Sequence, residues 1–598
     1  MAQQKFEQGK PGDEAYRYLD DYKALKEYID QTKYPNFKLG AGTTVNDYLH
    51  NSLVKNLTNK NFSETVAGNA MKMASCVDGN GNMDFTTVTN YVNAATNAGL
   101  SVYGHTLAWH SQQAKGWLLK LLADKPDLSA EKEYKVVQSK DFRTQQNVGW
   151  KASESDNGYT LSFDGTNGLK VTSTNSLQYQ VQFVAMDNIL LETNQTYKMT
   201  FTVKGSKAGK IGGHLGSWSV NGPSINVPFT TEWQDVTVSV KPQLASSFLL
   251  VQFPYYIGDV YIKEIKFEGY QAKTVPLTSQ ERHDTLVYAM DKWIKGMMTA
   301  CGGKVKAWDL VNEAIGGGND GQGNYELQHS DGYKNGTWDV GGDAFYWQDY
   351  RGDLEYVRQA CRLARQYGPE DVKLFINDYN LESDWDNNKK LTSLINWIKK
   401  WESDGVTKID GIGTQMHINC FENTNIQNSI KSHITRMFQL MANSGKLVRV
   451  SELDMGYVRG SNRWGSSVQT NQLTEAEHKK MADFYEWIIK EYLRIVPAGQ
   501  QWGICQRCTT DSPAGSGWRG GEPVGIWALN YYRKHTYAGF VRGLNGSDPT
   551  SVDAMETDGA TSVSGSIYNL AGMLMSATTV VELPVGVYIV NGEKVVVR

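Results

Sequence analysis

The sequence predicts an α/β fold, namely a (β/α)8 TIM barrel interrupted by an inserted antiparallel β-sandwich and followed by a short C-terminal β tail. Residues 1–127 and 276–545 alternate short apolar runs with amphipathic helical stretches, whereas residues 128–275 carry only short β-type runs. Roughly six to eight strand–helix units over about 400 residues fit a closed barrel better than an open doubly wound sheet. No GxGxxG turn follows a strand, which disfavours a dinucleotide-binding sheet.

The predicted barrel strands are short apolar runs, and the predicted helices are the amphipathic stretches between them. The runs are residues 37–42, 101–109, 305–311, 372–378, 411–418 and 446–454. The clearest helical stretches are residues 284–300, 354–368 and 477–496. This alternation predicts a parallel sheet with helices outside it, so the polar residues that end these strands should meet at one face.

Residues 128–275 break this rhythm and are predicted to form a separate domain. Their β-type runs are residues 159–163, 168–173, 177–185, 196–205, 210–216, 235–240, 247–253 and 259–269. Turn residues separate these runs roughly every 8–12 positions, which is typical of an antiparallel sandwich. The domain follows the strand-like run GHTLAWHSQ (104–112) and precedes a helix. We therefore expect it to occupy a βα loop, and such loops lie on the active-site face of a barrel.

The two ends of the chain bear on export. Residues 546–561 are small and polar, as in a linker, and the β-type runs 566–572 and 580–598 follow, with Asn591-Gly592 as a hairpin turn. This end resembles a shortened form of the C-terminal secretion and sorting modules of Bacteroidetes proteins, although an ordinary terminal hairpin fits equally well. The N-terminus shows no signal peptide. This fits either a cytoplasmic protein or one whose export signal has been removed, and we expect the second, an extracellular or cell-surface protein.

The composition excludes several classes of function. Lys plus Arg is 60 and Asp plus Glu is 64, so the net charge of −4 argues against a nucleic-acid partner and against a basic membrane-surface protein. No stretch approaches the length of a membrane-spanning helix. Six Cys are too few for a disulfide scaffold. The 17 Trp and 32 Tyr suit either a large core or the stacking of rings on sugars.

Two strand-like runs end on carboxylates that could act together. WDLVNEAI places Glu313 after a predicted strand, and KLVRVSELDM places Glu452 at the end of another. Glycoside hydrolysis needs two carboxyl groups, one to protonate the leaving oxygen and one to attack C1 or activate water. The spacing of Glu313 and Glu452 is compatible with different strands of one barrel. Solvated strand-end charges or structural ion pairs remain the alternative at this stage.

Five motifs, in order and spacing, carry a resemblance to a known family. GHTLAWHSQ (104–112), WDLVNEA (308–314), FINDYN (375–380), DGIGTQMHI (410–418) and VSELDM (450–455) resemble motifs of glycoside hydrolase family 10, the endo-β-1,4-xylanases. The resemblance covers nearly all of residues 36–120 and 276–530. It implies endo-acting hydrolysis of internal β-1,4-xylosidic bonds in xylan by a retaining double displacement.

The resemblance also implies the roles of individual residues. Glu313 corresponds to the acid/base, Glu452 to the nucleophile, and His417 should hydrogen-bond Glu452. Asn312 should contact the sugar 2-hydroxyl at subsite −1, and Trp502 and Trp518 should form aromatic lids over subsites −1 and −2. The full set of implied substrate-binding residues is Asn69, Lys72, His105, Trp109, Gln112, Asn312, Tyr379, Gln415, Trp502 and Trp518.

The chain departs from the family pattern in two places. Gly68 stands where the family has a glutamate that would bond a sugar hydroxyl at a distal negative subsite. The eighth-strand motif is spread over residues 501–518, which leaves the position of Trp518 open. Cys505-x-x-Cys508 in this segment suggests a structural loop or a local disulfide rather than a redox or zinc site. We expect neither metal nor cofactor, because His105 and His110 would point to opposite faces of a strand.

The inserted sandwich resembles the carbohydrate-binding modules often attached to bacterial xylanases. Trp218, Tyr255 and Tyr256 are the candidate platforms for sugar rings, although at most one of the two adjacent tyrosines belongs to the core if the segment is extended. Trp233 is expected in core or edge packing. The expected partners are xylan and xylo-oligosaccharides, and we expect a monomer. Two alternatives stay open: a barrel that binds carbohydrate but has lost catalysis, and a β-1,4-glucan as substrate.

Overall fold

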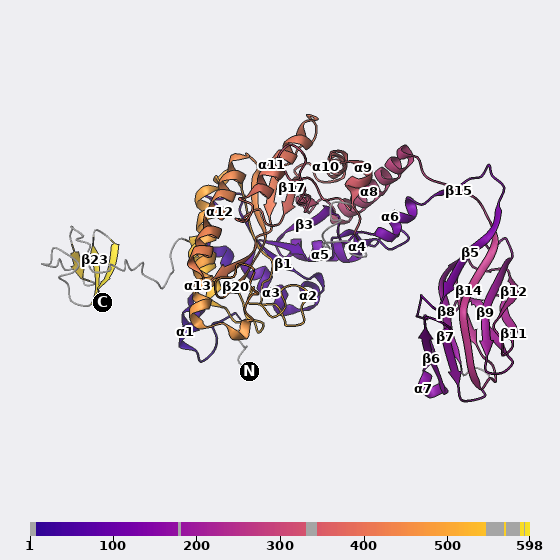
Figure 1. Ribbon diagram of the computed structural model, residues 1–598. Helices are drawn as coiled ribbons and strands as arrows, with labels where there is room; N and C mark the ends of the chain where they lie inside the picture. The colour runs from indigo at the N-terminus through magenta and orange to yellow at the C-terminus, as the bar shows by residue number, and fades with distance from the viewer. Residues whose placement is uncertain are drawn as a thin grey trace. The chain divides into compact units, whose positions relative to one another are not determined.

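The computed structural model describes residues 7–177, 181–330, 344–545, 567–569, 586–590 and 593–597. The chain divides into two compact units, one formed by Ala123–Leu277 and the other by Met1–Leu122 with Thr278–Arg598 (Figure 1). The sequence predicted the inserted domain at residues 128–275. Within the described residues, no helix has both the length and the apolar character needed to cross a membrane.

The first unit contains a closed barrel of parallel strands. Going round the barrel, the strands are β1 (Lys38–Thr43), β2 (Glu64–Ala67), β3 (Ser101–Ala108), β16 (Ala307–Asn312), β17 (Lys373–Asp378), β18 (Gly411–Thr414), β20 (Leu447–Val458) and β21 (Gln501–Gln506). Each pairs in parallel with the next, and β21 pairs with β1, so that Gly40 lies opposite Cys505 and closes the barrel. β19 (His417–Phe421) lies beside the second half of β20. This arrangement confirms the predicted (β/α)8 fold.

Helices surround these strands (Figure 1). The longer ones are α3 (Ser52–Asn61), α5 (Thr86–Asn97), α8 (Ser279–Cys301), α10 (Glu355–Tyr367), α11 (Lys389–Glu402), α12 (Thr424–Asn443), α13 (Glu475–Ile495) and α14 (His535–Asn545). The short ones are α1 (Glu14–Arg17), α2 (Val45–His50), α4 (Met73–Cys76), α6 (Lys115–Leu121) and α9 (Trp347–Arg351). Capping boxes start α8 at Thr278 and α13 at Thr474, where each threonine and the glutamate three residues later satisfy the first backbone N–H groups.

An apolar layer fills the end of the barrel where the strands begin. Tyr103, Ala307 and Phe375 form its buried centre, and Trp502 packs against Phe375 with ring centroids 5.6 Å apart. Trp502 is the second residue of β21, so it lies near the amino end of that strand. The expectation that Trp502 covers subsite −1 is therefore wrong, because substrate is bound at the carboxyl ends of barrel strands.

The second unit consists of two antiparallel sheets with their own core. One sheet has the order β11 (Ser224–Phe229), β10 (Gly209–Gly216), β13 (Ser246–Gln252), β8 (Gln182–Leu190). The other has the order β12 (Gln234–Val240), β9 (Tyr197–Gly205), β14 (Gly258–Gln271), β7 (Gly168–Ser173), β6 (Tyr159–Asp164), and β5 (Glu133–Asp141) also pairs with β14. Buried side chains such as Phe183, Phe201 and Leu249 form one cluster. A short helix, α7 (Glu154–Asn157), precedes β6.

Two short strands join the ends of this second unit. β4 (Lys125–Pro126) pairs antiparallel with β15 (Thr274–Val275). In chain order, the unit thus interrupts the connection from β3 to α8, after the short helix α6. This connection is a βα loop of the barrel, as the sequence predicted. The two antiparallel sheets of the second unit also agree with the predicted sandwich.

The C-terminal strands form a small antiparallel sheet. β22 (Ile567–Asn569) pairs with β23 (Gly586–Val590), and β23 pairs with β24 (Glu593–Val597). The predicted turn Asn591-Gly592 and the predicted linker 546–561 lie outside the described residues. The likeness of this end to a secretion and sorting module stays a prediction.

Candidate active site

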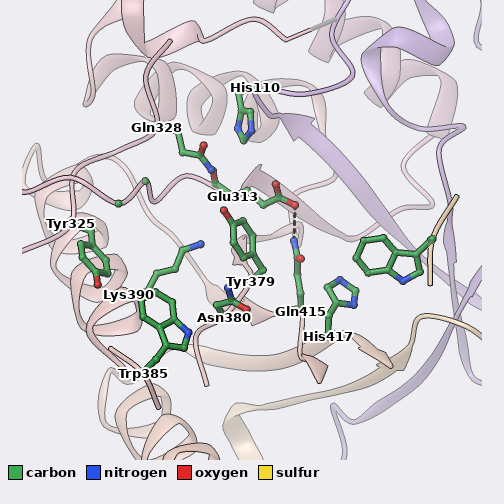
Figure 2. Close-up of a pocket in the computed structure, with 13 residues that line it drawn as sticks. His110, Glu313, Tyr325, Gln328, Tyr379, Asn380, Trp385, Lys390, Gln415 and His417 are labelled. Atoms are coloured by element: carbon green, nitrogen blue, oxygen red, sulfur yellow. Dashed lines mark hydrogen bonds between the residues drawn. The ribbon is translucent and has the colours of Figure 1, made fainter. Parts of the chain in front are cut away.

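A cavity of about 730 Å³ opens among the loops that follow the barrel strands. Its wall includes five of the predicted site residues, which are Glu313, Tyr379, Gln415, His417 and Trp518. Figure 2 shows Glu313 and Gln415 joined by a hydrogen bond, with Tyr379 and His417 on either side of them. Residues from several distant segments of the sequence thus line one cavity.

Three donors hold the Glu313 carboxylate. Trp109 Nε1 donates to Oε2 at 3.1 Å, while Gln415 Nε2 and Asn312 Nδ2 donate to Oε1 at 2.9 and 3.1 Å. Glu313 directly follows β16 and has a φ of 53°, a left-handed backbone conformation that is uncommon outside glycine. Its own backbone N–H donates to the carbonyl of Asn377 on β17 at 2.7 Å, which helps to hold this turn in place. The Glu313 side chain is therefore oriented before any ligand arrives.

Glu452 on β20 has a different environment. Asn377 Nδ2 donates to its Oε1 at 3.1 Å, and Oε2 lies 3.6 Å from both His417 Nε2 and Arg507 Nε. Burial favours the neutral acid, but the contact with His417 and the positive charge of Arg507 outweigh it and hold the pKa of Glu452 far below its usual range. Glu452 is therefore ionised, as a nucleophile must be.

His417 links Glu452 to a buried aspartate. Its Nδ1 lies 3.0 Å from Asp454 Oδ2, which is closer than its contact with Glu452. The contact predicted between His417 and Glu452 is present as an ion pair of 3.6 Å, and the closer partner of His417 is Asp454. Burial disfavours a charged imidazole, but the Asp454 and Glu452 carboxylates outweigh burial and raise the pKa of His417 to about 9. His417 is a cation at neutral pH.

Trp518 reaches the site even though its motif is spread out. Its Nε1 donates to Asp454 Oδ2 at 2.8 Å, and its ring packs edge-on against His417 at 4.6 Å between centroids. The side chain is 41% exposed. Trp518 therefore borders the cavity as the sequence suggested, whereas Trp502 does not.

Asn377 is a residue that the sequence reasoning did not select. Its Nδ2 donates to Asn312 Oδ1 at 2.9 Å as well as to Glu452, and its Oδ1 accepts from Ser451 Oγ at 2.5 Å. The side chain is fully buried. Asn377 thus connects Asn312, the neighbour of Glu313, to the Glu452 carboxylate. Its position inside the FINDYN motif was the signal that could have identified it.

Lys72 gathers a second group of predicted residues. Its Nζ donates to Asn69 Oδ1 at 2.9 Å and to Gln112 Oε1 at 2.6 Å, and it lies 4.7 Å from the centre of the Trp109 ring. His105 on β3 lies near this group, since its ring is 6.3 Å from that of Trp109. Its Nδ1 lies 2.7 Å from Asp309. Trp109 connects this group to Glu313, to which its Nε1 donates.

Arg507 is the second residue that the sequence reasoning missed. It directly follows β21, at the end of the barrel where the lid tryptophan of that strand was expected. Its side chain is 28% exposed, and its guanidinium carbon lies 5.8 Å from the centre of the Trp518 ring. A cation thus faces Glu452 from the last strand of the barrel.

The cysteines form no bridge in this segment. All six are free thiols, so the local disulfide considered for Cys505 and Cys508 is absent. Burial raises the pKa of both thiols to about 12, so neither is a thiolate at neutral pH. Across the part of the chain that the structure describes, no group of three or more His, Cys, Asp or Glu side chains is placed to hold a metal ion.

The aromatic residues of the second unit divide into exposed and buried ones. Trp218 and Tyr255 are 65% and 62% exposed. Tyr256 is 4% exposed, and its hydroxyl oxygen lies 3.1 Å from the carbonyl oxygens of both Lys207 and Asp259. Tyr256 therefore belongs to the core, and its selection as a sugar platform is wrong. Trp233 lies under Lys263 at 4.2 Å, in agreement with edge packing.

Trp218 is part of a larger aromatic surface that the sequence reasoning did not recognise. Its ring centroid lies 5.0 Å from that of Trp150 and 4.7 Å from that of Phe248. Trp150 is 49% exposed. We call Trp150, Trp218 and Phe248 the aromatic face of the insert. The three residues are far apart in sequence, so no local pattern could reveal that they meet.

A comparison with models of known protein families shows which family the chain belongs to. The sequence model described as Glycosyl hydrolase family 10 matches residues 26–139 and 271–542, which is well over half of the 598 residues. The chain belongs to glycosyl hydrolase family 10. The family match stops within the second unit and resumes at its end, so most of that unit is an addition to the family 10 domain.

Curated relatives share this family domain. Endo-beta-1,4-xylanase Xyn10C of Cellvibrio japonicus is 30% identical over 261 residues, covering 42% of this chain and 38% of the relative. The thermostable celloxylanase of Thermoclostridium stercorarium is 28% identical over 255 residues, covering 42% of this chain and 55% of the relative. The matches therefore span well under two thirds of these relatives.

Solved structures agree with the family 10 fold. Xylanase B from Clostridium stercorarium F9 superposes with a TM-score of 0.50 at 16% identity, over 87% of this chain and 99% of that one. A mutant protein solved in complex with xylotriose gives a TM-score of 0.50 at 15% identity, with the same coverage of both chains. At this identity the likeness concerns the fold alone.

Proposed function

We propose that this family 10 protein is a retaining endo-β-1,4-xylanase, with Glu313 as acid/base and Glu452 as nucleophile. The observation that carries the proposal is the contrast between two carboxylates, Glu313 just after β16 and Glu452 midway along β20. Glu452 faces two cations, whereas Glu313 is held by three neutral donors. Glu452 is thus held as an anion by two positive charges, whereas the groups that hold Glu313 are neutral. This is the division of roles that a double displacement requires.

In the first step, a Glu452 oxygen attacks C1 of the sugar while Glu313 gives its proton to the leaving O4. The C1–O4 bond breaks, and a covalent glycosyl-enzyme forms. In the second step, Glu313 takes a proton from water, the water oxygen attacks C1, and the bond to Glu452 breaks. Two inversions leave the product in the β configuration. Asn312 and Asn377, both hydrogen-bonded close to the carboxylates, would orient the reacting sugar and the nucleophile.

The substrate proposed is xylan, with xylo-oligosaccharides as shorter ligands. Lys72 is 6% exposed and held against Trp109, and Trp518 is fixed to Asp454, so rigid side chains line the sugar site. Such walls leave little room for the C6 hydroxymethyl group that glucose has and xylose lacks. A β-1,4-glucan is the second candidate, because one similar protein is named a celloxylanase. Reducing-sugar release from xylan and from carboxymethylcellulose, measured side by side, separates the two.

We also propose that the insert is a carbohydrate-binding module and that its aromatic face binds xylan. Exposed Trp150 and Trp218 offer flat rings of the kind that stack on pyranose rings. The insert has its own core and its ends are paired through β4 and β15, so residues 123–277 should fold alone. Retarded migration of this fragment in a xylan-containing native gel is the expected result. Free migration of the folded fragment would make it a spacer.

The remaining proposals concern the setting of the protein. We propose that the chain acts outside the cell or at its surface, because its polymeric substrate cannot enter the cell intact. Fractionation of cells that produce the full-length gene product, followed by detection in the medium and on the surface, tests this. We propose a monomer, which light scattering coupled to gel filtration would show directly.

A further inference from the structure

Within the part of the chain that the structure describes, Arg507 differs from the other cations around the nucleophile in having Glu452 as its one carboxylate within 4.0 Å. Among the described residues, its side chain makes no hydrogen bond within 3.5 Å, and Glu452 is the carboxylate within 4.0 Å, with Nε to Oε2 at 3.6 Å. Arg519, by contrast, is anchored by Asp454 at 2.7 Å and by Glu522 at 2.8 Å. The positive charge of Arg507 therefore acts chiefly on Glu452, and Asp454 is a weaker, more distant partner.

The charges that face Glu452 come from several elements of the barrel. His417 on β19 divides its charge between Glu452 and Asp454, and it lies closer to Asp454. His105 on β3 contacts Asp309 of β16 at 2.7 Å. Glu313 follows β16, Asp454 lies two residues along β20, and β17 contributes the neutral Asn377. Both imidazoles thus have a nearer carboxylate, whereas Arg507 does not.

We propose that Arg507 is a positioning residue which stabilises the Glu452 carboxylate and thereby speeds breakdown of the glycosyl-enzyme. The inference rests on the proposed function. In the covalent intermediate, Glu452 is a neutral ester and its attraction to Arg507 is lost. When water attacks C1 and Glu313 takes its proton, the electron pair of the C1–Oε bond returns to Glu452. The developing charge on Glu452 then meets the guanidinium, so Arg507 stabilises the transition state of this second step.

The same contact has the opposite effect on the first step. A carboxylate that is stabilised by a cation is a weaker nucleophile, so Arg507 slows attack on C1 to some extent. It also keeps Glu452 ionised at lower pH, since an opposite charge within about 4–6 Å favours the charged form. Arg507 thus shifts the balance between the two half-reactions and extends activity toward acid.

The test uses the full chain with 2,4-dinitrophenyl β-xylobioside, whose good leaving group makes the second step rate-limiting. Compared with wild type, Arg507→Gln should lower the steady-state kcat about tenfold while a pre-steady-state burst of dinitrophenol persists. The acidic limb of kcat/KM should move up by roughly one pH unit, because the nucleophile is protonated more readily without the cation. Arg507→Lys, which keeps the charge, should recover most of both effects.

Arg459→Gln is the matched control. Arg459 pairs with Glu477 at 2.6 Å and is not among the residues that line the cavity. Near-UV circular dichroism establishes that each variant is folded. A folded Arg507→Gln enzyme with the wild-type kcat and acidic limb overturns the proposal. If Arg507→Gln and Arg507→Lys lose kcat equally and the acidic limb of kcat/KM stays where it is in wild type, the proposal is also overturned. Arg507 would then have a packing role. A wild type inactive on xylosides and xylan instead refutes the proposed function itself.

Discussion

The barrel and the insert of this chain differ in which functional side chains they bury and which they expose. In the barrel, Glu452, Asn377 and Asp454 are buried or nearly so and are connected by hydrogen bonds and ion pairs. In the insert, Trp150 and Trp218 are about half or more exposed, and Trp218 packs on both Trp150 and Phe248. Chemistry needs dipoles and charges fixed in a dry site, whereas stacking needs flat surfaces open to a polymer.

The comparison teaches that catalysis and polymer binding should be separable in this chain. The family 10 match covers the barrel and stops within the insert, so the two regions differ in their relationships as well. Changes in the barrel should affect turnover and leave polymer binding by the insert intact. Changes to the aromatic face should do the reverse. Mutations in either region can test this separation.

The largest effect is expected from the two carboxylates. Glu452→Ala should reduce hydrolysis of every substrate on the order of 10⁴-fold or more, because no nucleophile remains. Glu313→Ala should lose xylan hydrolysis but retain much of its kcat/KM on aryl glycosides, whose leaving groups need little protonation, while kcat on them falls because the second step lacks its base. Initial rates on xylan and on an aryl xylobioside provide the measurement. Equal losses on both substrates in Glu313→Ala would contradict the assigned roles.

The aromatic face should produce the next largest effect, and only on polymer. In a Glu452→Ala background, Trp218→Ala should weaken retention on insoluble xylan about tenfold, since one stacking ring is lost. Trp150→Ala should act in the same direction. Tyr270→Ala is the control, because Tyr270 is 56% exposed on the other sheet and packs on Tyr134. If Tyr270→Ala weakens retention as much as Trp218→Ala, binding does not depend on the aromatic face.

His417 should make the stability of the barrel depend on pH. Its pKa of about 9 in the folded state exceeds its unfolded value of about 6.5, so the folded protein binds the proton more tightly. The stabilisation is complete below about pH 6.5 and is lost as the pH rises through 9. Urea unfolding at pH 6, 8 and 10 measures the free energy of unfolding of wild type and of His417→Asn. The difference between the two free energies should become smaller as the pH rises. A difference that stays constant would mean that His417 stabilises the barrel through packing.

The smallest effect is expected at Gly68. A Cβ atom there would meet only the carbonyl oxygen of Thr43, at 3.5 Å, and the backbone does not require glycine. Gly68→Glu should therefore fold normally and improve kcat/KM on short unbranched xylo-oligosaccharides a few-fold, while lowering it on substrates decorated at that subsite. Gly68→Ala is the control for the loss of glycine. The subsite assignment would fail if Gly68→Glu changed both kinds of substrate alike.

The sequence predicted most of the fold, because the barrel strands and helices repeat a strong local pattern. It also predicted the two carboxylates and the Lys72 group, because family motifs mark them. Trp502 was misplaced, since apolar residues at both ends of a barrel strand look alike in sequence. Tyr256 could not be told from Tyr255 without knowing which one faces the core. Trp150 and Arg507 acquire their meaning from distant partners, which no local pattern shows.

The most direct test of the whole account is the configuration of the first product. Xylohexaose is hydrolysed in the spectrometer, and the anomeric protons are followed by NMR in the first minutes, before mutarotation is complete. Retention through a covalent bond to Glu452 predicts that the β-anomer appears first and that the α-anomer grows later by mutarotation. The α-anomer as the initial product would show inversion and would contradict Glu452 as the nucleophile.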